Sequence, residues 1–77
     1  MHKGIDWDDL RLALAIARGE GLSGAARSLG INHATVFRRL NQLEERIGVR
    51  LFERSRTGYA ATPAGEKVVA QGSTLAA

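Results

Sequence analysis

The feature that most constrains the fold of this chain is a pair of predicted helices separated only by Gly30-Ile31-Asn32. The first helix is expected to take Ser23 as its cap and to run from Gly24 to Leu29. Gly30 suits the left-handed conformation that ends a helix, and Asn32 is a favourable cap for the next one. A short, glycine-containing connection between two helices is typical of a helix-turn-helix. The sequence therefore predicts this motif.

The second helix of the pair, predicted over residues 32–47, has one apolar face and ends at Gly48. Its apolar residues are spaced by four, three and four positions, which is the period of a helix packed against a core. These residues are Val36, Leu40, Leu43 and Ile47.

The opposite face of residues 32–47 is the candidate recognition surface. At about 100° per residue, small, polar and cationic residues occupy its N-terminal half, and acidic residues come only toward its end. A recognition helix enters the major groove of DNA with its N-terminal half, so this order suits a groove lined by phosphates. An ordinary surface helix of mixed charge is the alternative. The residues concerned are Ala34, Arg38 and Asn41 at the centre, Thr35 and Gln42 on one edge, and Phe37 on the other.

Segments on both sides complete the predicted fold. A helix is expected over residues 6–18, capped by Asp6 and rich in leucine and alanine. Residues 50–62 favour a two-stranded wing, with strands at Leu51-Phe52 and at residues 59–61 around a turn at residues 55–58. The predicted fold class is mainly α: a winged helix-turn-helix with a three-helix core, a short two-stranded wing and a C-terminal helix.

The C-terminal helix is expected to begin with Thr62 as its cap and Pro63 at its first position. Gly65 and Gly72 each cost a helix up to about 1 kcal/mol relative to alanine, so this helix is expected to need a partner. An apolar stripe of the helix is predicted to be left largely uncovered by the rest of the chain and to pair weakly with a second copy. It comprises Ala64, Val68 and Leu75.

The positive charge of the chain is confined to its middle. Residues 31–56 carry six arginines and three glutamates, and this excess of three equals the net charge of +3 of all 77 residues. Arginine is suited to bidentate contacts with phosphate and guanine, so DNA is the expected partner. A solvated basic surface is the alternative that charge alone leaves open.

Several other classes are unlikely on composition. The chain has no cysteine, and its two histidines, His2 and His33, are far apart, so neither a metal site nor a cofactor is expected. No apolar run of about 18 residues and no signal peptide is present, which predicts a cytoplasmic protein without membrane contact. No nucleophile motif is found, so the chain is not expected to be an enzyme.

Two other functions compete with DNA binding. Residues 19–24, GEGLSG, match the G-x-G-x-x-G pattern of dinucleotide sites, with Glu44 twenty residues beyond the last glycine. That pattern requires a preceding strand, whereas residues 10–17 are expected to be helical. The other rival is a winged helix used for protein–protein contact, which the arginine excess disfavours.

Four stretches of the chain resemble LysR-type transcriptional regulators. Residues 23–30, SGAARSLG, and the segment from Thr35-Val36 to Leu43-Glu44 resemble the helix-turn-helix of that family. Residues 48–54, GVRLFER, and 62–65, TPAG, are similar to its wing and to the start of its linker helix. The resemblance implies a DNA-binding domain at residues 1–62 and the start of a linker and dimerisation helix at 63–77. It also implies a homodimer and a further, effector-binding domain that this chain lacks, through which a small molecule would act.

The same resemblance implies roles for individual residues. His33, Ala34, Phe37 and Arg38 are expected to approach base edges. Arg54 and Arg56 are expected to reach phosphates or the minor groove from the wing. The family usually has glutamine, proline and serine where this chain has histidine at 33, alanine at 34 and phenylalanine at 37, and an aromatic residue where it has Ala13. The operator sequence, the effector and the choice between activation and repression are left open.

Phe37 has two interpretations. It lies at the edge of the recognition surface, with His33 one turn earlier on the same edge. Phenylalanine is usually buried, so the residue is either peripheral core or an apolar group presented to a thymine methyl in the major groove.

Overall fold

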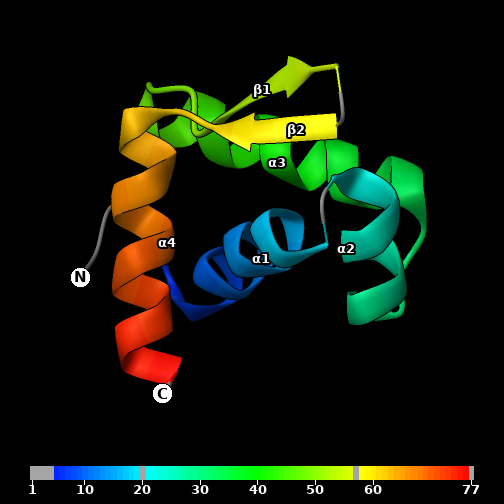
Figure 1. Cartoon of the computed structure of the whole chain (residues 1–77), viewed down its shortest axis with the longest axis horizontal. Helices are drawn as coiled ribbons and strands as arrows, with labels where there is room; N and C mark the ends of the chain where they lie inside the picture. The colour runs from blue at the N-terminus through cyan, green and yellow to red at the C-terminus, as the bar shows by residue number, and fades with distance from the viewer. Residues whose placement is uncertain (1–4, 20, 57, 77) are drawn as a thin grey trace.

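The computed structural model describes residues 5–19, 21–56 and 58–76, and for residues 73–76 the backbone alone. A two-stranded antiparallel sheet and four helices make up this part of the chain (Figure 1). The predicted mainly α winged helix-turn-helix is therefore confirmed. The elements are α1 (Trp7–Arg18), α2 (Leu22–Leu29), α3 (His33–Ile47), β1 (Phe52–Ser55), β2 (Gly58–Ala61) and α4 (Pro63–Ala76).

The start of α1 is joined to the end of α3. Asp6 caps α1 as predicted: its carboxylate accepts a hydrogen bond from the Asp9 backbone N–H at 3.0 Å, and the Asp9 carboxylate accepts one from the Asp6 N–H at 3.1 Å. The backbone N–H of Asp9 lowers the pKa of Asp6 below its usual value. Asp9 is buried and also accepts a charge-assisted hydrogen bond from the Arg46 guanidinium. This second bond ties the two helices together.

The predicted start of α2 is wrong. The helix begins at Leu22, with Gly21 as its cap at φ 130°, and Ser23 lies exposed in its first turn. Leu22 is buried in the core as the first residue of the helix. Glycine adopts a positive φ without strain, which lets the chain turn sharply before Leu22.

The other boundaries of the helix-turn-helix are confirmed. Gly30 ends α2 in the left-handed conformation, and Gly48 does the same for α3. The Asn32 side chain caps α3 by accepting from the Ala34 N–H at 2.7 Å.

The glycine pattern at residues 19–24 serves packing. A Cβ on Gly24 would lie 2.0 Å from the carbonyl oxygen of Gly19, so the end of α1 and the start of α2 meet at a distance that only glycine permits. The residues before Gly19 form a helix, as predicted, and not the strand that a dinucleotide site requires.

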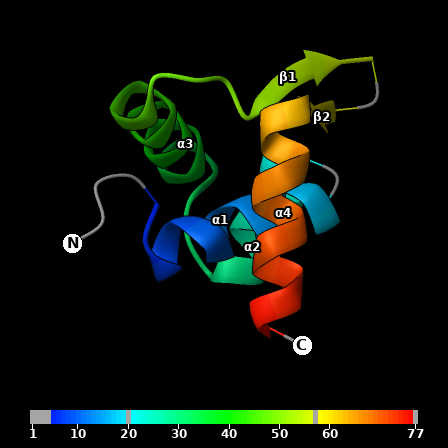
Figure 2. The same ribbon diagram turned by 90° about the vertical axis from the view of Figure 1, so that its left-hand side faces the viewer.

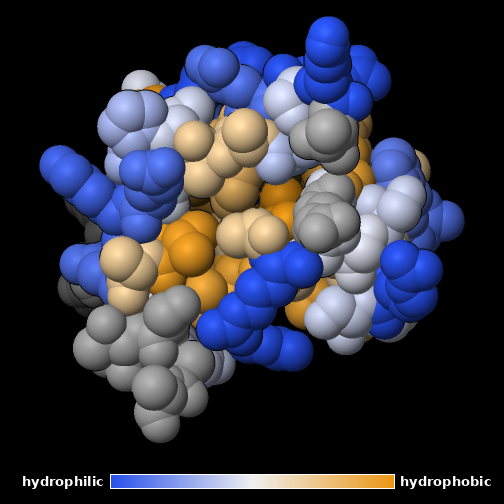
Figure 3. All heavy atoms as spheres, in the orientation of Figure 1, coloured by the Kyte–Doolittle hydropathy of each residue, from blue (hydrophilic) through white to orange (hydrophobic). Residues whose placement is uncertain are grey.

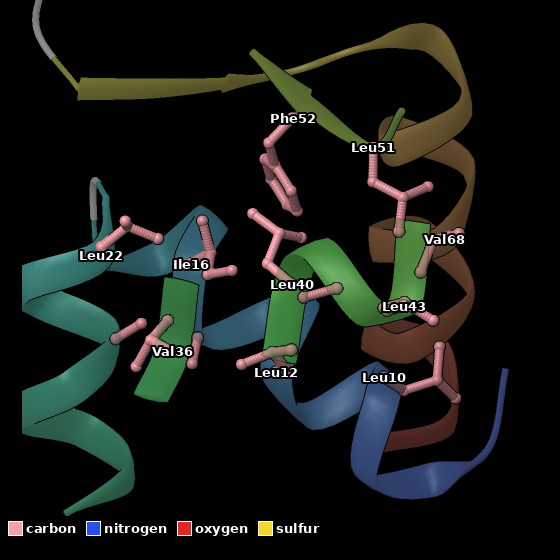
Figure 4. Close-up of a cluster of buried hydrophobic side chains, with 13 residues drawn as sticks. Leu10, Leu12, Ile16, Leu22, Val36, Leu40, Leu43, Leu51, Phe52 and Val68 are labelled. Carbon is pink, nitrogen blue, oxygen red and sulfur yellow. The ribbon is translucent and has the colours of Figure 1, made fainter. Parts of the chain in front are cut away.

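The core lies between α1, α3 and the root of the wing (Figure 4). The apolar face of α3 supplies Val36, Leu40 and Leu43, all fully buried, while Ile47 is half-buried against them. Leu51 and Phe52 close the core from the wing side. The strands are longer than predicted, with Phe52 opposite Ala61 and Ser55 opposite Gly58, so the first and last residues of the predicted turn belong to the strands.

The base of the wing is closed by Thr62. Its hydroxyl donates to the Arg50 carbonyl at 2.7 Å and accepts from the Gly65 N–H at 3.0 Å, as expected of a cap. Its own N–H donates to the Leu51 carbonyl at 2.9 Å. These bonds fix α4 directly to the start of β1.

The prediction that α4 leaves its apolar stripe uncovered is wrong. Val68 is buried in the core of its own chain and Ala64 is half-buried against it, while the Leu75 side chain lies outside the described residues. Helix α4 packs against α1, as the view in Figure 2 shows. Two glycines allow α4 to approach its neighbours closely: a Cβ on Gly65 would lie 1.9 Å from the Leu51 carbonyl oxygen at the root of the wing, and one on Gly72 would lie 3.1 Å from the side chain of Leu14 on α1.

Candidate nucleic-acid interface

An open groove of about 670 Å³ separates the N-terminal half of α3 from the wing. Its walls are the first turn of α2, the first turns of α3 and the tip of the wing. The groove brings together five of the residues predicted to contact DNA, from two segments some twenty positions apart in the sequence. They are His33, Ala34 and Phe37 on α3, and Arg54 and Arg56 on the wing.

The other four predicted residues lie on α3 outside this groove. Arg38, Asn41 and Gln42 are exposed and extend the polar face of the helix. Thr35 is half-buried, and its N–H donates to the carbonyl of Asn32 at 3.0 Å within the first turn. The groove and these residues together form one surface, called here the α3–wing surface.

Phe37 belongs to this surface and not to the core. Its side chain is 46% exposed, whereas Val36, the preceding residue, is fully buried. The interpretation of Phe37 as peripheral core is therefore wrong. His33, one turn earlier, lines the same groove, and Tyr59 lines it from the wing.

The wing is held against α3 by a residue that sequence reasoning assigned to the exposed face. Glu44 is half-buried, and its Oε2 atom accepts hydrogen bonds from the backbone N–H groups of Leu51, at 2.8 Å, and Phe52, at 3.2 Å. The sequence contains one indication of this contact. Glu44 lies four residues before Gly48, which ends the helix, and a carboxylate there can reach the backbone that follows Gly48. Glu44 thus positions the strand that carries Arg54.

The contribution of α2 to the groove was not predicted from the sequence. Ser23 was expected to be occupied as a cap, but it lies exposed in the first turn and lines the same groove as the wing arginines. Gly21 provides no side-chain cap, so backbone N–H groups of this turn face the N-terminal end of the helix without a side-chain acceptor there.

Polar and charged groups dominate the wing end of the molecule. In the space-filling view, hydrophilic residues gather over the wing, whereas apolar surface is exposed between α4 and α1 (Figure 3). The described residues contain no cluster of side chains able to hold a metal ion. None of the helices in that part of the chain is long and apolar enough to cross a bilayer.

A helix-turn-helix followed by an arginine-bearing wing defines a class, the winged helix-turn-helix DNA-binding domains. Within that class the chain belongs to one family: residues 7–66 match the model of the bacterial regulatory helix-turn-helix proteins of the lysR family. The family resemblance inferred from the sequence is therefore confirmed.

Relatives with curated names support the same assignment. An uncharacterized HTH-type transcriptional regulator of Mycobacterium bovis, Mb2303c, is 52% identical over 52 residues, which are 68% of this chain and 17% of that protein. The HTH-type transcriptional regulator BbuR of Bordetella bronchiseptica is 32% identical over 74 residues, 96% of this chain and 23% of that protein. The chain thus spans about a fifth of the length of these relatives. Their names describe regulators and not enzymes, in agreement with the prediction.

Solved structures show the same fold bound to DNA. The CbnR DNA-binding domain in complex with DNA matches with a TM-score of 0.82 and 26% identity, over 94% of this chain and 83% of that one. The BenM DNA-binding domain on the benA site 1 DNA matches with a TM-score of 0.84 and 26% identity, over 94% of this chain and 84% of that one.

Proposed function

We propose that this chain binds double-stranded DNA in a sequence-specific manner, as the DNA-binding part of a transcriptional regulator. Residues 32–47 lie in the major groove, and the wing, residues 50–62, lies against the backbone or the minor groove. The observation that carries this proposal is the single groove lined both by the N-terminal half of α3 and by two wing arginines. Such a groove accommodates one DNA strand between the recognition helix and the wing.

The residues of the α3–wing surface have different tasks in this arrangement. Arg38 donates to a base edge, because a guanidinium suits the two acceptors of guanine in the major groove. Arg54 and Arg56 contact phosphates, which gives affinity without sequence preference. Amide, hydroxyl, imidazole and small apolar groups complete the recognition surface. They belong to His33, Ala34, Thr35, Phe37, Asn41 and Gln42.

The chain is proposed to be one part of a longer regulator. Its relatives are about four times as long, since 52 aligned residues are 17% of one and 74 aligned residues are 23% of another. Residues 1–62 are then the DNA-binding domain and residues 63–77 the start of a linker helix that leads to an effector-binding domain. A small molecule acts through that further domain. The site of action is the cytoplasm, where bacterial DNA is found.

Homodimerisation through α4 is part of the proposal. The Val68 face of α4 is occupied by its own chain, so a second copy must use another face. Apolar surface exposed between α4 and α1 offers one (Figure 3). The dimer of this chain alone is weak, because so short a helix buries little area. Sedimentation should detect association at high concentration; a strict monomer at millimolar concentration that binds a palindromic duplex one-to-one would contradict it.

Selection from a random duplex library tests the proposed function. The chain should enrich a defined motif, in two halves related by two-fold symmetry if it binds as a dimer. An Arg11→Ala variant, altered on α1 outside the α3–wing surface, should enrich the same motif. A folded chain that enriches no motif would contradict sequence-specific binding and favour a winged helix used for protein contact.

A further inference from the structure

Phe37 is a large apolar side chain exposed within the candidate DNA interface. Three such side chains, Trp7, Phe37 and Val49, are exposed in the described part of the chain. Among them, Phe37 lines the groove between α3 and the wing. Trp7 lies at the start of α1, and Val49 follows the end of α3.

The fold does not depend on the Phe37 ring. Val36 and Leu40 anchor this part of α3 in the core and are almost completely buried. Phe37 is 46% exposed beside them, and an ordinary polar residue would fit the same position on the helix surface. Ala34, one turn earlier and also exposed, is too small to cover the ring. The ring is therefore accessible to whatever enters the groove.

We infer that Phe37 is a specificity-determining residue that packs against the C5 methyl group of thymine at one position of each half-site. This inference rests on the proposed function. Thymine is the only base with a methyl group in the major groove; the other bases present only hydrogen-bond donors and acceptors there. Phenylalanine is one of the side chains that make apolar contact with this methyl group. The neighbouring Arg38 and His33 can instead hydrogen-bond to base edges.

The identity of the base is thus set by one methyl group at that position. Removal of the methyl should weaken binding without changing Watson–Crick pairing, the phosphates or the hydrogen-bonding groups of the base. Burying a group of this size changes an affinity by about three- to fivefold. Uracil is the matched probe, because it differs from thymine only by lacking the methyl.

The test uses the motif that the native chain selects from a random duplex library. Each thymine of one half-site is replaced in turn by deoxyuridine, and dissociation constants are measured for the native chain and for Phe37→Ser. One replacement should weaken the native chain about three- to fivefold and leave the affinity of Phe37→Ser for the two probes equal. Trp7→Ser, which removes an exposed aromatic side chain outside the groove, should retain the full loss. Phe37→Gln serves the same comparison if the serine variant does not fold.

Three results would overturn the inference while DNA binding stands: a motif without thymine, no effect of uracil at any position, or an equal loss in the native chain and in Phe37→Ser. Failure of the proposed function gives a different result, namely a folded native chain that enriches no motif at all.

Discussion

The carboxylate of Glu44, near the end of α3, accepts a hydrogen bond from the backbone N–H of Leu51 at 2.8 Å and a second from Phe52 at 3.2 Å. One side chain therefore fixes the first residue of β1 relative to the recognition helix. The spacing between the α3 and wing residues of the groove depends on this link.

Replacement of Glu44 by alanine should destabilise the chain and loosen the wing. The Leu51 and Phe52 N–H groups would lose their acceptor, which costs roughly 1–3 kcal/mol in the free energy of unfolding. Glu44→Gln retains an acceptor oxygen and should cost less. Denaturant unfolding followed by circular dichroism measures both. Glu45→Ala, at the exposed neighbouring position, is the control, and an equally large loss in that variant would refute the special role of Glu44.

Gly65→Ala should destabilise the chain even though alanine favours a helix. The new Cβ would lie 1.9 Å from the Leu51 carbonyl oxygen, so α4 must move away from the root of the wing. Overpacking of this kind typically costs about 1–3 kcal/mol. Gly72→Ala should cost less, because its Cβ meets the flexible Leu14 side chain at 3.1 Å. Thermal unfolding of the two variants compares them directly, and greater stability of Gly65→Ala than of the native chain would contradict the packing described here.

Arg38→Ala should reduce sequence discrimination. Loss of a bidentate contact with a base costs roughly 1–3 kcal/mol on the selected site and much less on random duplex. Fluorescence anisotropy on the two duplexes gives the comparison. Equal losses on both would reassign Arg38 to a phosphate contact.

Neutralising the wing should weaken all DNA sequences alike. Arg54→Gln and Arg56→Gln should each reduce the slope of log affinity against log salt by about one unit, because one fewer counterion is released. Arg11→Gln removes an exposed arginine on α1 and should leave the slope unchanged. An unchanged slope in both wing variants would mean that the wing does not contact DNA.

The parts of the fold that could be predicted are those governed by neighbouring residues. Asp6, Asn32, Gly30 and Gly48 act on their own helix ends through side-chain caps or a left-handed backbone, and each does so in the structure. The start of α2 was misplaced because burial of Leu22 outweighs the capping preference of Ser23. Burial depends on the whole fold, which a local pattern does not contain.

In the candidate interface, too, local features could be predicted and contacts between distant segments could not. Helical periodicity placed Phe37 and Arg38 on or beside the exposed face of α3, and both are exposed. The bond of Asp9 to Arg46 joins positions 37 residues apart, and no short-range pattern indicates it. The bond of Glu44 to Leu51 spans seven residues, and its one local signal is the distance of Glu44 from Gly48. The packing of α4 against its own chain was not predicted for the same reason. A glycine in a helix indicates low helix stability, but it does not indicate which surface packs against the helix.

Whether the α3–wing surface binds DNA can be measured from the salt dependence of affinity for a random-sequence duplex. A DNA-binding α3–wing surface predicts a linear fall of log affinity with log salt, with a slope of about −0.9 for each phosphate contacted, and therefore a steep loss between about 50 and 200 mM salt. Affinity that is absent at low salt, or that is independent of salt, would contradict the claim and indicate that this winged helix does not bind DNA.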